Sequence, residues 1–194
     1  MSLKEKKFWI FDMDGTLTKS AHDFPKIKNE LSLPQELDIL AGIKQLPASV
    51  QKEKHKKLEE IELEIAKISV LNNGIPELLE DLNSKGNKFA ILTRNTLKNT
   101  KETILATGLN LFFPDEWILT RDDCEPKPSP QGIYILLAKW NAVPNLAVMV
   151  GDYIYDLECG RDANIATAYF DPTSTFPYKH SADYLISDFR EINI

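Results

Sequence analysis

The sequence alternates short, largely apolar runs with segments of helical periodicity, and this alternation limits the possible folds more than any other feature. The apolar runs span residues 8–11, 88–92, 147–150 and 165–170, with shorter candidates at 117–119 and 184–186. Helical patterns lie between them, at 76–84, 97–107, 130–140 and 156–162. Strands without a polar face must be covered on both sides. The pattern therefore predicts an α/β fold with a doubly wound, Rossmann-like parallel sheet.

Residues 17–72 break this alternation and carry helical signals only. Leu58, Ile61, Ile65 and Ile68 recur at helical spacing, which predicts one apolar face of an amphipathic helix. Upstream, Pro34 ends a first short helix and suits the first turn of a second one, expected at 34–43. We therefore expect a core domain of residues 1–16 and 73–194, with a small helical insertion, residues 17–72, after the first strand.

The composition limits the size of the fold and the cellular compartment and partners that we expect. Its 194 residues are 43% hydrophobic, enough for one domain with an insertion, and the formal net charge of -6 argues against non-specific nucleic-acid binding. The two cysteines form no paired motif, which favours a reducing compartment. No apolar run resembles a signal peptide or approaches the roughly 20 residues that cross a bilayer. We expect a soluble, cytoplasmic protein with no nucleic-acid or membrane partner, and make no prediction of its oligomeric state.

Polar side chains follow three of the predicted strands at the point where each strand ends. They are Asp12, Thr93 and Asp152. Ligands of open parallel sheets bind outside the carboxyl ends of the strands, so these three positions predict one site.

Asp12 and Asp14 stand one residue apart, and on an extended segment their side chains point to the same side. Two close carboxylates repel each other, and a divalent cation with oxygen ligands, such as Mg²⁺, relieves that repulsion. A bare pair of this kind is also common as a turn cap. Asp156 adds acidic charge after Asp152, although it could equally open a helix, and Lys127 sits in a loop stiffened by flanking prolines. Together these residues favour a site over a turn.

In this order, the residues resemble the motifs of the haloacid dehalogenase superfamily of phosphatases and related phosphotransferases. The D-x-D-G-T motif stands at residues 12–16, the strand-end Thr is Thr93, the Lys is Lys127, and the acidic G-D-x-x-x-D motif runs from Gly151 to Asp156. The second Asp of the first motif, Asp14, is absent from the dehalogenases of the superfamily, whose leaving halide needs no proton. The resemblance therefore implies phosphoryl transfer.

The resemblance also implies a role for each matched residue. Asp12 would be the nucleophile that forms an aspartyl-phosphate, and Asp14 the general acid and base. Mg²⁺ would be bound by the Asp12 side chain, the Asp14 backbone carbonyl and Asp152, while Asp156 would orient Lys127 or a metal-bound water. The transferring phosphoryl group would be bound by three residues: Thr93, Asn95 and Lys127.

The position of the insertion is similar to that of the helical C1 cap in the phosphoglycolate-phosphatase-like branch of the superfamily. Such a cap closes over the site and supplies specificity contacts. Arg94, next to Thr93, is a candidate contact for a substrate carboxylate or second phosphate. Candidate contacts from the insertion are His22, Asp23, Lys44 and His55.

The expected function is that of a magnesium-dependent phosphatase that hydrolyses a small phosphorylated metabolite, phosphoglycolate-like or a sugar phosphate, through an aspartyl-phosphate. Two alternatives stay open. One is a phosphosugar mutase built on the same core, and the other is a non-catalytic binding protein that retains the fold.

Overall fold

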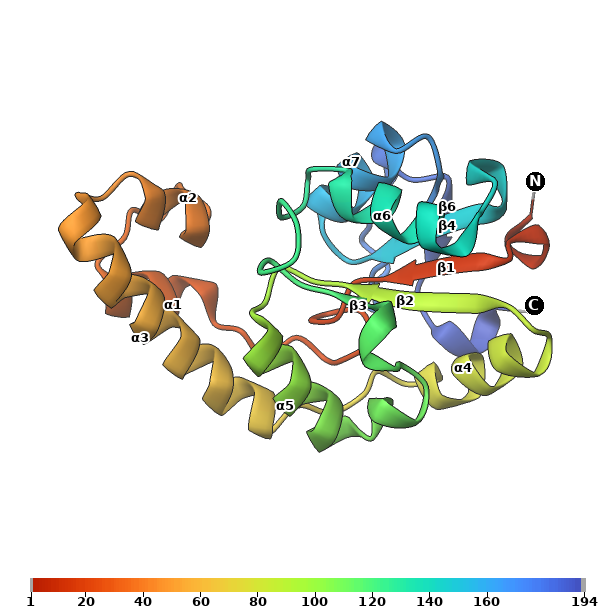
Figure 1. Ribbon diagram of the computed structural model, residues 1–194, viewed down its shortest axis with the longest axis horizontal. Coiled ribbons are helices and arrows are strands. Elements are labelled where there is room, and N and C mark those ends of the chain that lie inside the picture. Colours follow the sequence, from red (N-terminus) through yellow and green to blue (C-terminus); the bar gives the residue numbers. More distant parts are fainter. Residues whose placement is uncertain (1, 193–194) are drawn as a thin grey trace.

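The computed structural model describes residues 2–192, and its centre is a six-stranded sheet (Figure 1). The strand order is β3-β2-β1-β4-β5-β6, and every neighbouring pair is parallel. This confirms the predicted α/β, Rossmann-like fold. The strands are β1 (Phe8–Phe11), β2 (Lys88–Leu92), β3 (Ile118–Leu119), β4 (Ala147–Gly151), β5 (Ala166–Phe170) and β6 (Tyr184–Ile186).

Strand β1 lies in the middle of the sheet and fixes the place of the site. Its last residue, Phe11, is in register with Ile91 of β2 on one side and with Val150 of β4 on the other. The residues that follow these three strands therefore emerge side by side at the carboxyl edge.

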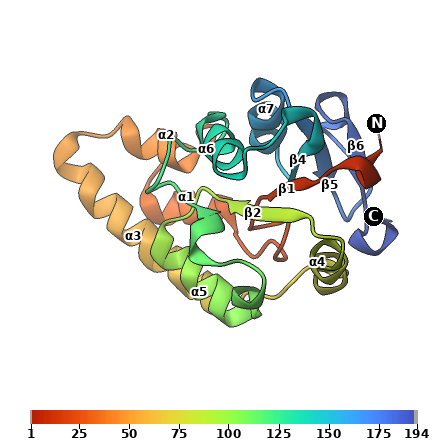
Figure 2. The same ribbon diagram turned by 45° about the vertical axis from the view of Figure 1, so that its right-hand side comes forward.

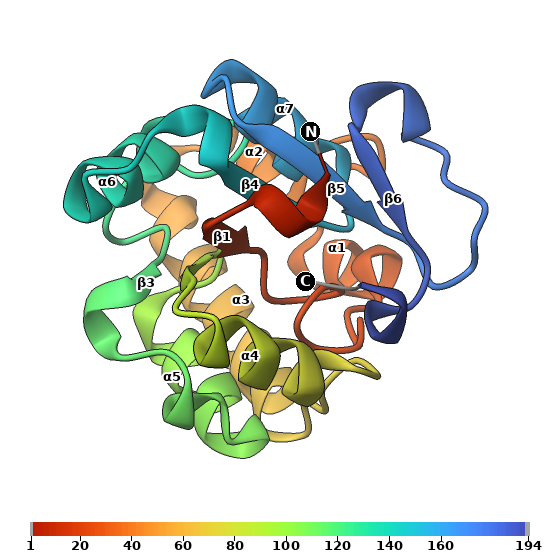
Figure 3. The same ribbon diagram turned by 90° about the vertical axis from the view of Figure 1, so that its right-hand side faces the viewer.

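Two helical layers cover the sheet, as Figure 3 shows. Trp9 and Phe11 of β1 pack on the face covered by α4 (Ile75–Ser84) and α5 (Leu97–Thr107). Ile10, which alternates with them, packs on the opposite face beneath α6 (Gln131–Trp140) and α7 (Ile154–Asp162). Because successive strand residues point to opposite faces, a strand buried between two layers has to be apolar throughout. Six short 3-10 helices complete the described chain: Leu3–Glu5, Leu109–Leu111, Asp115–Trp117, Pro144–Leu146, Lys179–Ser181 and Phe189–Glu191.

Three helices follow β1 and lie beyond the carboxyl ends of the strands (Figures 1 and 2). They are α1 (Phe24–Leu31), α2 (Ile39–Lys44) and α3 (Ala48–Lys67). They share a small apolar core of their own, formed by Ile27, Leu31, Leu33, Ile39, Ile43 and Leu58.

Two details of this helical segment differ from the sequence prediction. Helix α2 begins at Ile39 and not at Pro34, because Asp38 caps it by accepting hydrogen bonds from the backbone N–H groups of Leu40 and Ala41. Ile68 is 72% exposed because it lies just past the end of α3, outside the apolar face. Within residues 2–192, no helix combines the length and apolar character that a membrane crossing requires.

Candidate active site

The turn after β1 leaves space beside Gly15 for the carboxylate of Asp152. Gly15 has a φ of 87°, a left-handed conformation that favours glycine. A Cβ atom at this position would lie 2.6 Å from Cγ of Asp152, far inside van der Waals contact. The buried Asn72 fixes the same turn, because its side-chain amide donates to the carbonyls of Gly15, Thr16 and Thr18 at 3.2, 2.7 and 2.9 Å. The turn therefore brings the backbone against Asp152.

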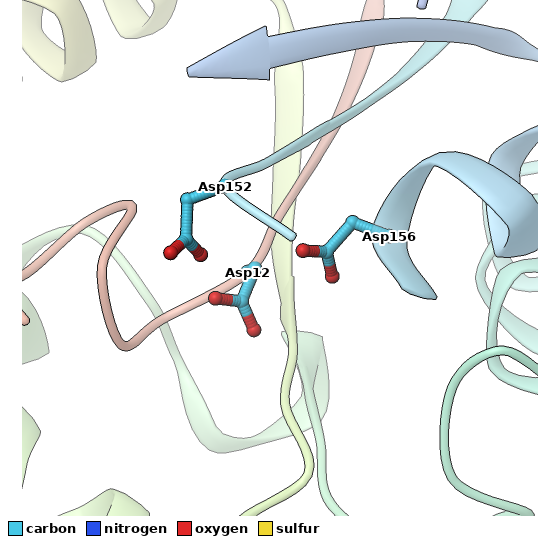
Figure 4. Close-up of side chains that lie close together, drawn as sticks. All are labelled: Asp12, Asp152 and Asp156. Atoms are coloured by element: carbon cyan, nitrogen blue, oxygen red, sulfur yellow. The ribbon is translucent and has the colours of Figure 1, made fainter. Parts of the chain in front are cut away.

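Asp12, Asp152 and Asp156 form an acidic cluster at the carboxyl edge of the sheet. Each offers a carboxylate oxygen, and these oxygens lie within 4.8 Å of one another. Figure 4 shows the three carboxylates turned toward one another. Asp12 follows β1, Asp152 follows β4, and Asp156 lies in the first turn of α7, so the cluster depends on the adjacency of β1 and β4.

Lys127 is the buried cation of this cluster. Its Nζ donates to Oδ1 of Asp12 and, at 2.6 Å, to Oδ1 of Asp156. Burial disfavours its charge, but the two aspartates outweigh that effect and hold the pKa of Lys127 above its usual value. The second oxygen of Asp156 accepts a hydrogen bond from the backbone N–H of Tyr153 at 3.1 Å. Both oxygens of Asp156 are thus engaged, which leaves Asp12 and Asp152 as the carboxylates with capacity for a metal.

The cluster is electrostatically unbalanced in the protein alone. Burial, opposed by Lys127, raises the pKa of Asp12 to about 7. Burial and the nearby charges of Asp12 and Asp156 raise the pKa of Asp152 to about 8. One cation does not compensate two buried carboxylates and the half-buried one of Asp152, and a divalent ion with oxygen ligands would. The donor set and the space that Gly15 leaves beside Asp152 fit Mg²⁺.

Asp14 lies outside the acidic cluster and has separate partners. The side-chain amide of Asn95 donates to Oδ2 of Asp14 at 2.6 Å, and Nδ1 of His22 lies 4.0 Å from its Oδ1. Burial raises the pKa of Asp14, while His22 and Asn95 oppose that rise. The carboxylate of Asp14 thus has hydrogen-bonding and charged partners of its own, and its raised pKa suits a group that gives and takes protons.

The structure places the remaining predicted residues as follows. Thr93 is buried at the end of β2, and its hydroxyl oxygen accepts a hydrogen bond from the backbone N–H of Asn95 at 3.2 Å. Arg94 forms a double hydrogen bond with Asp38, so its predicted contact with substrate stays a prediction, as does phosphate binding by Asn95.

The four candidates from the helical segment separate in space. His22 faces Asp14, whereas Asp23 is exposed and caps α1 by accepting from the backbone N–H of Lys26. Lys44 and His55 line a cavity of about 950 Å³ between the helical segment and the loops that follow β2 and β3. Only His22 therefore approaches the proposed catalytic residues.

Sequence reasoning did not identify Asn72, Asp38 or the pair Glu62 and Arg121. The Arg121 guanidinium donates to both oxygens of Glu62 on α3 and to the backbone carbonyl of Arg94. These contacts join residues far apart in the chain. The only local signal is that of Asp38, whose place before an apolar pair suits a helix N-cap.

Comparison with known proteins defines the class of this site. A sequence model of the haloacid dehalogenase-like hydrolase family matches residues 9–170. An uncharacterized hydrolase of Saccharomyces cerevisiae is 30% identical over 98% of this chain and 90% of its own length. The phosphoglycolate phosphatase of Aquifex aeolicus is 31% identical over 82% of both chains. The chain belongs to the haloacid dehalogenase-like hydrolase family, and the predicted enzyme class, a phosphoric monoester hydrolase, is confirmed.

Solved structures agree on the fold. A predicted phosphoglycolate phosphatase from Haemophilus somnus superposes with a TM-score of 0.73 at 24% identity, covering 95% of each chain. A hydrolase from Pseudomonas syringae superposes with a TM-score of 0.79 at 19% identity, covering 95% of this chain and 94% of its own.

Proposed function

We propose that this hydrolase is a magnesium-dependent phosphatase that acts on a small phosphorylated metabolite, phosphoglycolate-like or a sugar phosphate, through an aspartyl-phosphate on Asp12. The observation that carries the proposal is the pairing of two aspartates in different environments. Asp12 contacts Lys127 inside the acidic cluster, whereas Asp14 lies beside it with Asn95 and His22. One carboxylate thus contacts a buried lysine within the acidic cluster, and the other contacts a side-chain amide and lies near an imidazole.

The first half-reaction forms the covalent intermediate. A carboxylate oxygen of Asp12 attacks phosphorus, and the bond between phosphorus and the ester oxygen breaks. Asp14 donates its proton to the departing oxygen, which leaves as an alcohol. The raised pKa of Asp14, caused by burial, favours the protonated form that this step needs.

The second half-reaction releases phosphate. Asp14, now ionised, takes a proton from water, whose oxygen attacks phosphorus and breaks the bond to Asp12. Inorganic phosphate leaves and both aspartates return to their first state. Lys127 and the hydroxyl of Thr93 bind the phosphoryl oxygens during both steps, and this binding positions phosphorus for in-line transfer.

Asp12, Asp152 and the backbone carbonyl of Asp14 would hold Mg²⁺. When bound, the ion offsets the negative charge of the carboxylates and of the phosphoryl group. Asp156 supports this arrangement indirectly, because it holds Lys127 through its Oδ1 atom.

The helical segment, residues 17–72, is proposed to act as a cap on a core formed by residues 1–16 and 73–194. Its position beyond the carboxyl ends of the strands supports this role (Figure 1). It also has an apolar core separate from those of the sheet, and His22 reaches from it to Asp14. The cap would exclude water from the reaction and contact the leaving group.

The test is hydrolysis of p-nitrophenyl phosphate with and without Mg²⁺. Wild type should turn over only with the metal, and Asp12→Asn should lower kcat by about a thousandfold or more, since it removes the nucleophile. Asp23→Asn, which removes an exposed charge that caps α1, should retain activity. Comparable activity of Asp12→Asn and wild type would exclude Asp12 as the nucleophile.

A further inference from the structure

Arg94 is fixed at the edge of the proposed active site. It follows Thr93 and precedes Asn95, whose amide holds Asp14. Its guanidinium lies over the ring of Tyr155, 4.9 Å from the ring centroid, and Tyr155 precedes Asp156 in the first turn of α7. The guanidinium therefore lies against the acidic motif at the start of α7, and the next residue in the chain contacts Asp14.

Asp38 occupies both Nη atoms of this guanidinium. Nη1 and Nη2 of Arg94 donate to Oδ2 and Oδ1 of Asp38 at 2.9 and 2.8 Å. This is the two-pronged geometry by which arginine binds the carboxylate or phosphate of a ligand. A carboxylate of the protein thus stands where the carboxylate of a substrate would bind.

Asp38 is also held in place from its own side. Its Oδ1 accepts from the backbone N–H groups of Leu40 and Ala41 at 3.1 and 3.2 Å, because Asp38 is the N-cap of α2. Burial alone would favour its neutral form, but Arg94 and these N–H groups together lower the pKa of Asp38. Asp38 therefore presents a fixed negative charge at this point of the cap.

Arg94 also has a buried donor that the pair with Asp38 does not engage. Its Nε is buried and has no hydrogen-bond partner among residues 2–192. A single N–H can serve a hydroxyl or an ester oxygen, whereas recognition of a carboxylate by arginine normally uses two donors.

We infer that Asp38 is a specificity-determining residue that neutralises Arg94 and selects substrates whose leaving group is uncharged near the phosphate. The inference rests on the proposed phosphatase function and narrows its substrate class to phosphates of neutral, hydroxyl-bearing alcohols. A short acidic leaving group would meet the charge of Asp38, and Arg94 is already paired with that charge. Such unfavourable contacts are an effective source of specificity.

Two small phosphate esters test this inference directly. 2-Hydroxyethyl phosphate and 2-phosphoglycolate differ only in a neutral hydroxymethyl group in place of a carboxylate. With Mg²⁺ present, the kcat/KM of wild type should be at least about tenfold higher for 2-hydroxyethyl phosphate than for 2-phosphoglycolate.

Asp38→Asn should raise kcat/KM for 2-phosphoglycolate by about tenfold and leave kcat/KM for 2-hydroxyethyl phosphate nearly unchanged. The ratio of the two kcat/KM values therefore falls by about tenfold. Asparagine caps helices as well as aspartate does, so α2 retains its N-cap. Glu36→Gln, an exposed position in the same loop, removes the same charge without contacting Arg94 and should leave the ratio unchanged.

Each of the following results overturns the inference: a wild type that prefers 2-phosphoglycolate or hydrolyses both esters equally, an Asp38→Asn variant that changes both activities alike, or an equal effect of Glu36→Gln. Turnover of neither ester by an enzyme that hydrolyses p-nitrophenyl phosphate counts as no discrimination and also overturns it. If the enzyme hydrolyses neither these two esters nor p-nitrophenyl phosphate, the result contradicts the proposed phosphatase function itself.

Discussion

At the scale of single residues, Asp12 and Asp152 make the metal-free protein sensitive to pH. Their pKa values are raised from about 4 in the unfolded chain to about 7 and about 8, chiefly by burial. Between about pH 4 and about pH 8, the folded protein therefore binds more protons than the unfolded chain. The stabilisation that these two groups give at acidic pH is therefore lost as the pH rises through the folded pKa values.

This linkage predicts how Mg²⁺ affects thermal stability. Mg²⁺ should raise the Tm more at about pH 8.5 than at about pH 5.5, because it binds the ionised carboxylates and must compete with protons at the lower pH. Scanning calorimetry at both pH values, with metal and with chelator, measures the effect. Asp152→Asn serves as the comparison: it should raise the Tm of the metal-free protein at the higher pH and remove most of the response to Mg²⁺. An equal Mg²⁺ effect at both pH values in wild type would contradict the assignment of Asp152.

Gly15 provides a second prediction at this scale. Gly15→Ala should weaken Mg²⁺ binding and lower kcat/KM by about tenfold or more, because the new methyl group displaces the Asp152 carboxylate. Gly86→Ala is the matched control, since Gly86 also has a positive φ, 70°, but nothing lies within 4 Å of the added atom. Both variants should lose about 1–2 kcal/mol of unfolding free energy from backbone strain. Equal Mg²⁺ affinity in the two variants would show that space at Gly15 does not matter to the site.

At the scale of elements, α3 is joined to the core by a buried ion pair. Glu62 on α3 binds Arg121 and also accepts a hydrogen bond from the side-chain amide of Asn99 on α5 at 3.0 Å. The side chains of Arg121 and Glu62 are only 12% and 10% exposed. Removing one partner leaves the other charge buried, and such losses are large.

Glu62→Ala should therefore lower the free energy of unfolding by about 3 kcal/mol, measured by urea denaturation. Glu59→Ala, three residues earlier on the same helix, removes a more exposed pair with Lys98 and should cost less than about 1 kcal/mol. Similar losses in the two variants would mean that the Glu62–Arg121 pair adds little to the attachment of α3.

The same elements show what local sequence signals can and cannot decide. The strands were predictable because runs such as residues 8–11 and 147–150 have no polar face. The start of α2 was not, because Pro34 and Asp38 both carry helix-start signals and only the side-chain hydrogen bonds of Asp38 decide between them. The cap forms at Asp38, four positions after the predicted helix start at Pro34.

At the scale of the whole molecule, the sheet order explains why so much of the site could be predicted. Asp12, Thr93 and Asp152 follow the adjacent strands β1, β2 and β4, and parallel strands deliver their carboxyl ends to one edge. The contacts of the helical segment with the core could not be predicted. Arg94 and Asp38 are 56 residues apart, and Arg121 and Glu62 are 59 apart, and neither pair belongs to a local pattern. Such contacts depend on how the helical segment packs onto the core.

If Asp12 carries the phosphoryl group during turnover, acid quenching should trap the phosphorylated enzyme. Wild type with Mg²⁺ and excess p-nitrophenyl phosphate should be quenched within the first turnovers, digested at low pH and analysed by mass spectrometry. The peptide that contains Asp12 should gain one phosphoryl group, which hydroxylamine removes and which Asp12→Asn lacks. Rapid turnover with no phosphorylated peptide, or with the phosphoryl group on a peptide lacking Asp12, would contradict this role of Asp12.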